Sequence, residues 1–317
     1  MTTRKTLQKF ILDNKYSNEI ILRNNQYFEN QYISSLYYVI KNGVESGDRT
    51  GTGTIRSEIG QRFVFDSEYI PLLRGKLVNP HNALTEVIWV LTGRNDLKWL
   101  KDNGVNYWDS WVNEAGNFGP IYGPQMRNQN GFDQLLYVIN KLNESPESRQ
   151  ALINLWHGSE LSQMSLPPCH NQYHPLIVNN RLHLHCGQRS SDAFLGVPYD
   201  YMLFYFIQRI LCYWTNTKPG NIIHTNNDYH IYQNQYASIA QYFENYFNNP
   251  QEKDFDSHIN IELEFPDKDL YINADDKLSS DDLTQWLNDF YLMNKNFKTN
   301  YSDKNLRYGL IKTNIAV

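Results

Sequence analysis

The segment from His174 to Trp214 has the sequence HPLIVNNRLHLHCGQRSSDAFLGVPYDYMLFYFIQRILCYW. Two short runs, His174–Val178 and Arg181–Cys186, flank the pair Asn179-Asn180, and this arrangement predicts a β-hairpin. Residues 198–214 predict a long buried helix with a proline near its start. A strand pair followed by a buried helix, in a chain without regular strand–helix alternation, indicates the α+β class.

The same patterns predict further elements on both sides of this segment. Apolar residues at helical spacing indicate helices, and alternating or β-branched runs indicate strands. The expected helices cover residues 30–42, 82–92, 132–142 and 280–293, and the expected strands cover residues 54–65, 151–156, 221–230 and 259–265. No internal repeat or low-complexity linker divides the chain.

The composition is that of a globular protein with a mildly acidic balance. Among 317 residues, 29 basic side chains stand against 34 acidic ones, which gives a net charge of −5. Proteins that bind nucleic acid mainly through its phosphates carry a basic excess. Nucleic acid is therefore not an expected partner, whereas small anionic ligands stay open.

The sequence predicts neither secretion nor membrane insertion. Residues 1–19 are polar and lack the apolar core of a signal peptide. The most apolar stretch, residues 201–214, is interrupted by Gln208 and Arg209 and is too short to span a bilayer. Three cysteines are too few, and odd in number, for a disulfide framework. We expect a soluble cytoplasmic protein with reduced thiols and no membrane partner.

A glycine-rich turn containing an arginine lies at residues 48–54, with the sequence DRTGTGT. Arg49 offers a forked donor, and glycines allow backbone amides to approach a phosphate. The turn fits neither a Walker loop nor a dinucleotide-binding fingerprint. Taken alone, it predicts a phosphate-binding loop and an ordinary turn equally well.

Cys169 follows two prolines and precedes His170. Prolines fix the backbone and hold the next residue in place, and a fixed thiol near cationic groups is a candidate nucleophile. The alternative is a buried structural cysteine.

A Cys/His cluster offers a competing interpretation as a zinc site. Its members are Cys169, His170, His174, His183, His185 and Cys186. Their spacings match no standard zinc pattern. On a strand, His183 and His185 would share one face while Cys186 points to the other. We therefore expect no metal.

Two further polar patterns point to ligand binding. Residues 188–200, with the sequence QRSSDAFLGVPYD, gather charged and hydroxyl groups immediately before the apolar helix. His230 and Tyr232 stand two residues apart in a predicted strand, so they share a face and could bind one hydroxyl group.

Taken in order, these segments resemble the thymidylate synthase family from about Gln31 to Tyr236, and again at residues 315–317. The blocks that carry the resemblance are residues 48–54, WDSW at 108–111, GPIYG at 119–123, Ser148-Arg149, Pro168-Cys169-His170, residues 188–200 and HIY at 230–232. The resemblance implies a large mixed sheet with flanking helices, and sheets stacked back to back in a homodimer. It also implies one domain over residues 29–317, with a polar N-terminal extension at 1–28 and a divergent insertion at 247–303.

The resemblance implies a role for each matching position. Cys169 attacks C6 of a pyrimidine nucleoside monophosphate, Glu86, His170 and Tyr122 order a water and proton network, and Asp200 reads the base. The implied ligands of the nucleotide phosphate are Arg49, Arg189 and Ser190, together with Arg149 from the second subunit. His230 and Tyr232 are the implied ligands of the sugar hydroxyl, and Gln188 is a further implied ligand of the nucleotide. The implied ligands of 5,10-methylenetetrahydrofolate are Lys76, Trp108, Trp111, Asp192, Gly196 and Ala316.

The chemistry of the residues agrees with these roles. Addition of a thiolate to C6 turns the weakly nucleophilic C5 into an enamine or enolate carbon that can accept a one-carbon unit. Nearby arginines favour the thiolate. Glu86 suits proton transfer if burial raises its pKa.

Two positions depart from the family pattern. Gln150 stands where the family usually has a second arginine, so one phosphate ligand is missing. Asp200 stands where thymidylate synthases have asparagine, as it does in the family's cytidylate-handling branch. An ionised carboxylate facing uracil O4 places one hydrogen-bond acceptor against another. Cytosine is matched either by a protonated carboxyl group or, when its N3 is protonated, by a carboxylate. We expect a cytidylate, CMP or dCMP.

The product is less constrained by the sequence. Cytidylate members of the family mostly hydroxylate, which favours hydroxymethylation. Trp108 and residues 315–317 are retained, and a closed, dry site favours hydride over water. Thymidylate synthesis from dUMP, C5 methylation of dCMP, and an inactive nucleotide- or RNA-binding relative remain alternatives. The enzyme would work in the cytoplasm of a bacterium, or of a host cell if a phage encodes it.

Overall fold

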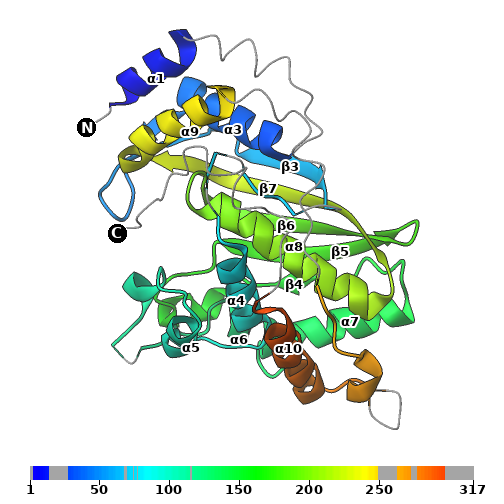
Figure 1. The fold of residues 1–317 in the computed structure, drawn as a ribbon. Helices are drawn as coiled ribbons and strands as arrows, with labels where there is room; N and C mark the ends of the chain where they lie inside the picture. The colour runs from blue at the N-terminus through cyan, green and yellow to red at the C-terminus, as the bar shows by residue number, and fades with distance from the viewer. Residues whose placement is uncertain are drawn as a thin grey trace.

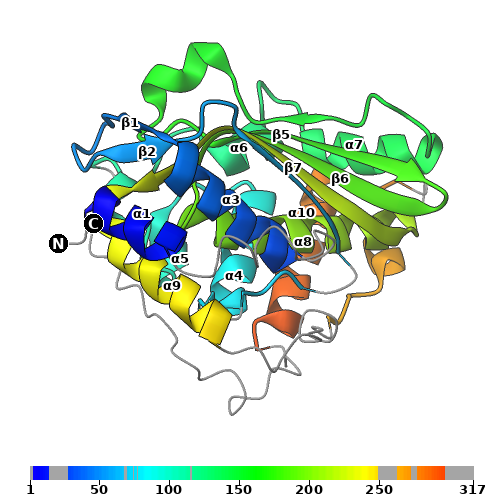
Figure 2. The same ribbon diagram turned by 90° about the horizontal axis from the view of Figure 1, so that it is seen from above.

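A computed structural model describes residues 3–13, 28–67, 70–73, 75–76, 78–114, 116–248, 263–272 and 277–296. In these residues the sheet has seven strands in the order β1-β2-β7-β6-β5-β4, and β3 also pairs with β7. Figure 1 labels β3 to β7, and Figure 2 labels β1 and β2. The strands are β1 (Val44–Ser46), β2 (Thr54–Arg56), β3 (Gln61–Asp66), β4 (Ile153–Asn154), β5 (His170–Val178), β6 (Arg181–Asp192) and β7 (Lys218–Tyr232). Neighbours are antiparallel except β6 and β7, which are parallel. The predicted α+β class with a large mixed sheet is confirmed.

The β5–β6 hairpin sets the positions of the candidate site residues. Asn179 and Asn180 have φ values of 51° and 58°, the left-handed pair that a tight two-residue hairpin requires. From this turn the register runs back to His170 opposite Gln188. The Pro168-Cys169-His170 segment and the polar run at 188–200 are thereby brought side by side. The predicted hairpin is confirmed.

The described residues also form α-helices. They are α1 (Arg4–Asp13), α3 (Phe28–Asn42), α4 (Pro80–Leu91), α5 (Leu97–Asp102), α6 (Tyr122–Arg127), α7 (Gln134–Glu144), α8 (Gly196–Thr215), α9 (Tyr236–Asn248) and α10 (Ser280–Asn294). Helix α8 contacts β6 and β7, and α4 packs on α8. Seen from above, α3, α4, α8 and α10 lie on the same side of β5, β6 and β7 (Figure 2). On β6 the residues that face these helices are buried and the alternate ones are partly exposed.

The structure differs from the sequence-based expectations in three places. The expected strand at 54–65 is two strands, β2 and β3, because the chain turns at residues 57–60, where Gly60 has a φ of +67°. The expected strand at 151–156 is reduced to β4. Residues 263–265 form no strand, and the rest of the expected strand at 259–265 lies outside the described residues.

Helix α1 lies within the segment expected to be a polar extension. Its residues Leu7 and Ile11, four positions apart, are fully buried, and the helix packs on α3 and α9. Arg4 donates to the carbonyl of Gly43 at the end of α3. These contacts attach residues 4–13 to the body of the protein.

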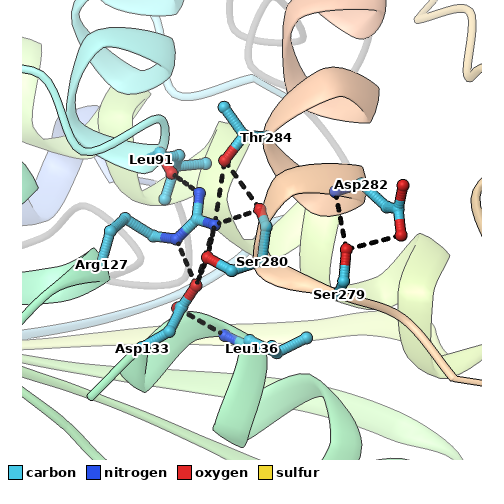
Figure 3. A network of polar contacts seen from close by, with 8 residues as sticks. All are labelled: Leu91, Arg127, Asp133, Leu136, Ser279, Ser280, Asp282 and Thr284. Carbon is cyan, nitrogen blue, oxygen red and sulfur yellow. Dashed lines mark hydrogen bonds and ion pairs between the residues drawn. The ribbon is translucent and has the colours of Figure 1, made fainter. Parts of the chain in front are cut away.

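The guanidinium of Arg127 joins three helices at the end of the sheet (Figure 3). It donates to Asp133 Oδ2 at 2.9 Å, to the Leu91 carbonyl of α4 at 2.6 Å and to the Ser280 carbonyl of α10 at 2.9 Å. Asp133 also caps α7 by accepting from the Leu136 amide at 3.0 Å. The Arg127 and Asp133 side chains are only 5% and 11% exposed, so solvent screens this ion pair weakly.

Replacement of Arg127 by methionine is expected to lower the free energy of unfolding by about 3–5 kcal/mol, because it leaves the buried Asp133 carboxylate without its counter-charge and takes one donor from each of two carbonyls. Urea titration followed by circular dichroism measures the change. Lys98→Met is the matched control, since the Lys98–Asp102 pair is 82% and 57% exposed and should contribute less than about 1 kcal/mol. Equal effects of the two variants would contradict the assigned role.

Candidate active site

Cys169 is held at the start of β5 by its own backbone. Its N–H donates to the Tyr122 hydroxyl at 2.8 Å, and its carbonyl accepts from the Arg189 N–H at 2.9 Å. The Arg189 guanidinium donates to the carbonyls of Pro168 and Pro167 at 2.9 and 2.7 Å. One arginine of β6 therefore fixes the two prolines that place the cysteine.

Opposing effects act on the Cys169 thiol. Burial raises its pKa and the charge of Asp200 raises it further, whereas the charge of Arg189 and a hydrogen bond from Tyr122 lower it. The net pKa lies above the ordinary value, so the protein without substrate holds a neutral thiol at pH 7. Arg189 is the cationic group that favours the thiolate needed for nucleophilic attack.

His170 and Asp200 form the centre of a hydrogen-bonded chain beside the cysteine. His170 Nε2 lies 2.9 Å from Asp200 Oδ1, and His170 Nδ1 lies 2.6 Å from the Tyr173 hydroxyl. Gln188 Nε2 donates to Asp200 Oδ2 at 3.0 Å and to the Ser190 carbonyl at 3.0 Å. Both partners of Gln188 Nε2 are acceptors, so this end of the side chain is the NH₂ group.

The chain continues through two residues of β7. Gln188 Oε1 lies 2.6 Å from His224 Nε2, and Asn226 Nδ2 lies 3.3 Å from His224 Nδ1. Burial lowers the pKa of His224 to about 3, so its ring is neutral and its Nε2–H donates to Gln188. Ser191 donates in turn to Asn226 Oδ1. The orientation of each group is therefore set, and Asp200 Oδ2 is constrained to act as an acceptor.

Glu86 of α4 lies near the hydrogen-bonded chain formed by His170 and Asp200. Its Oε2 accepts from the Tyr107 hydroxyl at 2.7 Å. Burial raises the pKa of Glu86 to about 7, which the Tyr107 hydrogen bond and His170 oppose and the charge of Asp200 supports. A carboxyl group with such a pKa can both accept and return a proton at neutral pH. The Glu86 residue as a whole is partly exposed, and the burial of its carboxyl group is the main cause of the raised pKa.

The arginine loop lies at the end of β7. Asp48 holds it by accepting from the amides of Thr50 and Gly53 at 2.7 and 2.6 Å. Gly53 has a φ of +84°, and a Cβ there would come within 2.8 Å of the Gln233 side chain, so the position requires glycine. The Arg49 guanidinium, exposed at the tip, stacks on the Trp111 ring with 4.7 Å to its centroid.

His230 and Tyr232 share one face of β7, as predicted, with ring centroids 5.2 Å apart. Asp228 Oδ1 lies 3.4 Å from His230 Nδ1, and Arg56 pairs with Asp228 Oδ2 at 2.9 Å. The Tyr232 phenol is close enough to Cys169 and Arg49 for their charges to affect its pKa, although burial is the main cause of its rise. The Tyr232 phenol therefore lies within electrostatic range of the cysteine.

The residues assigned to folate lie in different environments. Trp108 is buried against Trp89, Phe118 and Tyr122, with ring centroids 5.4–6.2 Å apart. Asp192 accepts from the amides of Phe194 and Leu195 at 2.9 Å and from Gln235 at 2.8 Å, so it holds the turn before α8. Gly196 begins α8, and a Cβ there would lie 3.9 Å from Asp200 Oδ2.

Three assigned residues are not tied to this group. Lys76 is buried, donates to the Phe194 carbonyl and lies over the Phe194 ring; burial lowers its pKa to about 7. Arg149 is exposed in the turn after α7, and no contact within the described ranges connects it to Cys169. Ala316 lies outside the described residues.

Four residues of the site were missed by the sequence analysis: Tyr107, Tyr173, His224 and Asn226. Tyr173 follows His170 by three positions in β5, and a bulge at residues 170–172 brings the two side chains together. The β7 residues reach the site through the parallel pairing of Gln188 with Asn226. The alternation of polar residues at 224 and 226 in a predicted strand was the available signal.

In the part of the chain that the structure describes, no three His, Cys, Asp or Glu side chains gather as a metal site would require. The three cysteines are unpaired. No described helix has the length and apolar character needed to cross a membrane.

The sequence matches the model of a known protein family. The sequence model of the family described as "Thymidylate synthase" matches residues 30–267, which is more than half of the 317 residues. The matched range contains Cys169, His170, Arg189, Asp200 and Glu86. It ends before α10.

Proposed function

Since the chain belongs to the thymidylate synthase family, we propose that it transfers a one-carbon unit to C5 of a cytidylate and releases the hydroxymethyl product. Family membership supports folate-dependent one-carbon transfer to a pyrimidine, with methylenetetrahydrofolate as cosubstrate. The choice of cytidylate and of water as the second reactant is the proposal.

The observation that carries the choice of base is the pair of contacts made by Asp200. Gln188 donates to Oδ2 at 3.0 Å and His170 Nε2 lies 2.9 Å from Oδ1, so both oxygens of the side chain are held in place. A carboxylate pairs in bidentate fashion with N3-protonated cytosine, whose N3–H and N4–H both donate. Uracil offers one donor and one acceptor on the same edge. Facing the carboxylate, its O4 would repel.

Cys169 supplies the covalent step. Its thiolate adds to C6, and the electron pair of the C5–C6 double bond makes C5 nucleophilic. Addition of the thiolate brings a negative charge onto the ring. In cytosine the proton at N3, which Asp200 holds, compensates this charge. Arg189 and Arg49 provide the positive charge for the nucleotide phosphate, which also favours the thiolate.

The methylene donor must lie against the base. Trp108, packed on Tyr122 next to Cys169, offers an aromatic ring to a planar heterocycle, and this fits a folate. When bound, the folate supplies the one-carbon unit. Glu86, with a pKa of about 7, is the group placed to take a proton from the water that completes the product.

Mass spectrometry of the products tests this function. The purified protein is incubated with methylenetetrahydrofolate and, separately, dCMP, CMP or dUMP. A hydroxymethyl group on a cytidylate, with dUMP unchanged, is the expected result. A methyl group on dUMP as the main product would identify a thymidylate synthase and overturn the proposal, and a methyl group on a cytidylate would overturn only the role of water.

The exposed face of the sheet supports a dimer. Helices α3, α4, α8 and α10 lie on one side of β5, β6 and β7. Val64 and Val178, at positions that alternate with the buried residues of β3 and β5, are 42% and 55% exposed. We infer that a second copy covers this face. Arg149, which has no contact with the site among the described residues of its own chain, would then serve the partner's nucleotide.

Mixing two inactive variants tests the shared site. Arg149→Ala and Cys169→Ala homodimers should each be inactive or weak. Mixed dimers form one site that has both residues, so up to about a quarter of wild-type activity should return after subunit exchange, because half of the dimers are mixed and each has one complete site. Activity that stays at the level of the separate variants, with exchange shown by native mass spectrometry, would contradict donation in trans.

A further inference from the structure

We propose that Tyr107 is a positioning residue for the water that completes the reaction: its hydroxyl holds Glu86 Oε2 and so directs Oε1 to the water. This inference rests on the proposed hydroxymethylation and assigns a residue to its last step. Tyr107 belongs to none of the motifs discussed in the sequence analysis.

The contact joins two separate elements. Glu86 lies in the middle of α4, and Tyr107 lies in the turn between α5 and the 3-10 helix η1 (Asp109–Trp111). The Tyr107 hydroxyl donates to Glu86 Oε2 at 2.7 Å, and its ring packs on Tyr199 of α8 with centroids 5.6 Å apart. A carboxylate bound at one oxygen by a donor fixed in this way cannot rotate freely, so the direction of the other oxygen is defined.

A second donor lies beside the same carboxylate. The buried Trp108 indole acts on Glu86 as a hydrogen-bond donor that lowers the carboxyl pKa, although no acceptor lies at full hydrogen-bonding geometry among the described residues. The indole N–H is therefore directed at this carboxylate, in agreement with the rule that buried indole N–H groups have a partner.

The chemistry of the step balances without a further reactant. After the folate and the C5 proton have left, the one-carbon unit is an exocyclic methylene group on C5, and the water oxygen forms a bond to its carbon. The electron pair of that double bond moves to form the ring C5–C6 double bond, and the C6–Sγ bond to Cys169 breaks as the thiolate leaves. The water proton passes to Glu86, so nothing is oxidised or reduced.

The charge of Glu86 depends on its neighbours from every side. The groups that change the pKa of Glu86 are Asp200 of α8, His170 of β5, Trp108 and Tyr107. The phenols of Tyr122, Tyr173 and Tyr199 are close enough for the charge of Glu86 to affect their own pKa values. Burial raises its pKa to about 7, and the Tyr107 hydrogen bond lowers it by favouring the carboxylate. Loss of this bond must therefore raise the pKa, which leaves less carboxylate to accept a proton at pH 7.

Tyr107→Phe tests the inference because it removes only the hydroxyl. The apparent pKa of Glu86 should rise by about one unit, and the acid limb of kcat for the hydroxymethyl product should move up equally. At pH 7 the carboxylate fraction falls from about one half to about one tenth, so kcat should fall about fivefold while KM changes less than about twofold. Infrared titration of the protein without substrates measures the pKa directly, from the carboxyl band that Glu86→Gln removes.

Tyr199→Phe is the matched control, since it deletes a phenol hydroxyl next to the same carboxylate without removing the hydrogen bond from Tyr107. Its carboxyl band and acid limb should match those of the wild type. A second variant carries 3,5-difluorotyrosine at position 107, which nearly keeps the side-chain volume. Its hydroxyl is a stronger hydrogen-bond donor than that of tyrosine, so the pKa of Glu86 should fall.

The outcomes separate this inference from the proposed function. An unchanged Glu86 pKa in Tyr107→Phe, while the wild type makes the hydroxymethyl product, overturns the role of Tyr107 alone. A wild type that makes no hydroxymethyl product overturns the proposed function, and the role for water with it, whatever the titration shows.

Discussion

Cys169→Ser is expected to reduce product formation by about 10⁴-fold or more while the protein stays folded. The serine hydroxyl is far less acidic than the thiol, and neither the charge of Arg189 nor the Tyr122 hydrogen bond can make it a comparable nucleophile at neutral pH. The backbone contacts that hold this position, to Tyr122 and Arg189, do not involve the sulfur and should persist.

The measurement pairs turnover with detection of a covalent adduct. A nucleotide with fluorine at C5 cannot lose a proton there, so the adduct between Cys169 and C6 should accumulate and add the mass of the ligands to the wild-type protein. Cys169→Ser should show no such adduct. Circular dichroism and a thermal melt establish that the variant is folded.

Cys212→Ala is the matched control, because Cys212 is a buried cysteine of α8 whose pKa burial raises to about 11. It should keep near wild-type turnover and lose about 1 kcal/mol of stability or somewhat more from the small cavity. Residual activity of Cys169→Ser above about one hundredth of wild type would contradict nucleophilic catalysis by this residue.

The parts of the fold that local sequence determines were predictable. Asn179 and Asn180 favour the left-handed conformation of a tight hairpin turn, and that turn fixes the register that brings His170 opposite Gln188. The apolar run of α8 predicts its burial. Because one turn and one helix place Cys169, Gln188 and Asp200 together, the centre of the site could be anticipated from a short stretch of the chain.

The parts that depend on non-local pairing were not predictable in the same way. His224 and Asn226 meet Gln188 and Ser191 only because β7 runs parallel to β6 in one particular register. Tyr107 meets Glu86 through the packing of a turn on α4, and no local pattern specifies that contact. The burial of α1 likewise depends on α9, which lies far along the chain.

Asp200→Asn is expected to reverse the preference between cytidylate and uridylate. Gln188 Nε2 donates at the position of Oδ2, so an amide at position 200 must place its oxygen there and its NH₂ at the position of Oδ1, next to His170. An amide offers uracil an acceptor for N3–H and a donor for O4. It offers N3-protonated cytosine no compensating charge.

The size of the change follows from the hydrogen bonds exchanged. The substitution removes one mismatch with uracil and introduces one with cytosine, each about 1–3 kcal/mol in a site closed to water. The ratio of kcat/KM for cytidylate over uridylate should therefore fall by between about 30-fold and 10⁴-fold, since each 1.36 kcal/mol is tenfold. Competition between dCMP and dUMP in one vessel, followed by mass spectrometry, measures this ratio directly.

Asp192→Asn serves as the comparison, because it makes the same change of carboxylate to amide in the same region. Asp192 accepts from two amides and Gln235, so its replacement should weaken the turn before α8 and lower the activity toward both nucleotides. The ratio between the two should stay within about threefold of the wild type, because Asp192 holds the backbone, whereas Asp200 is the residue that we propose faces the base. A ratio that is equally unaffected by Asp200→Asn would show that position 200 does not read the base.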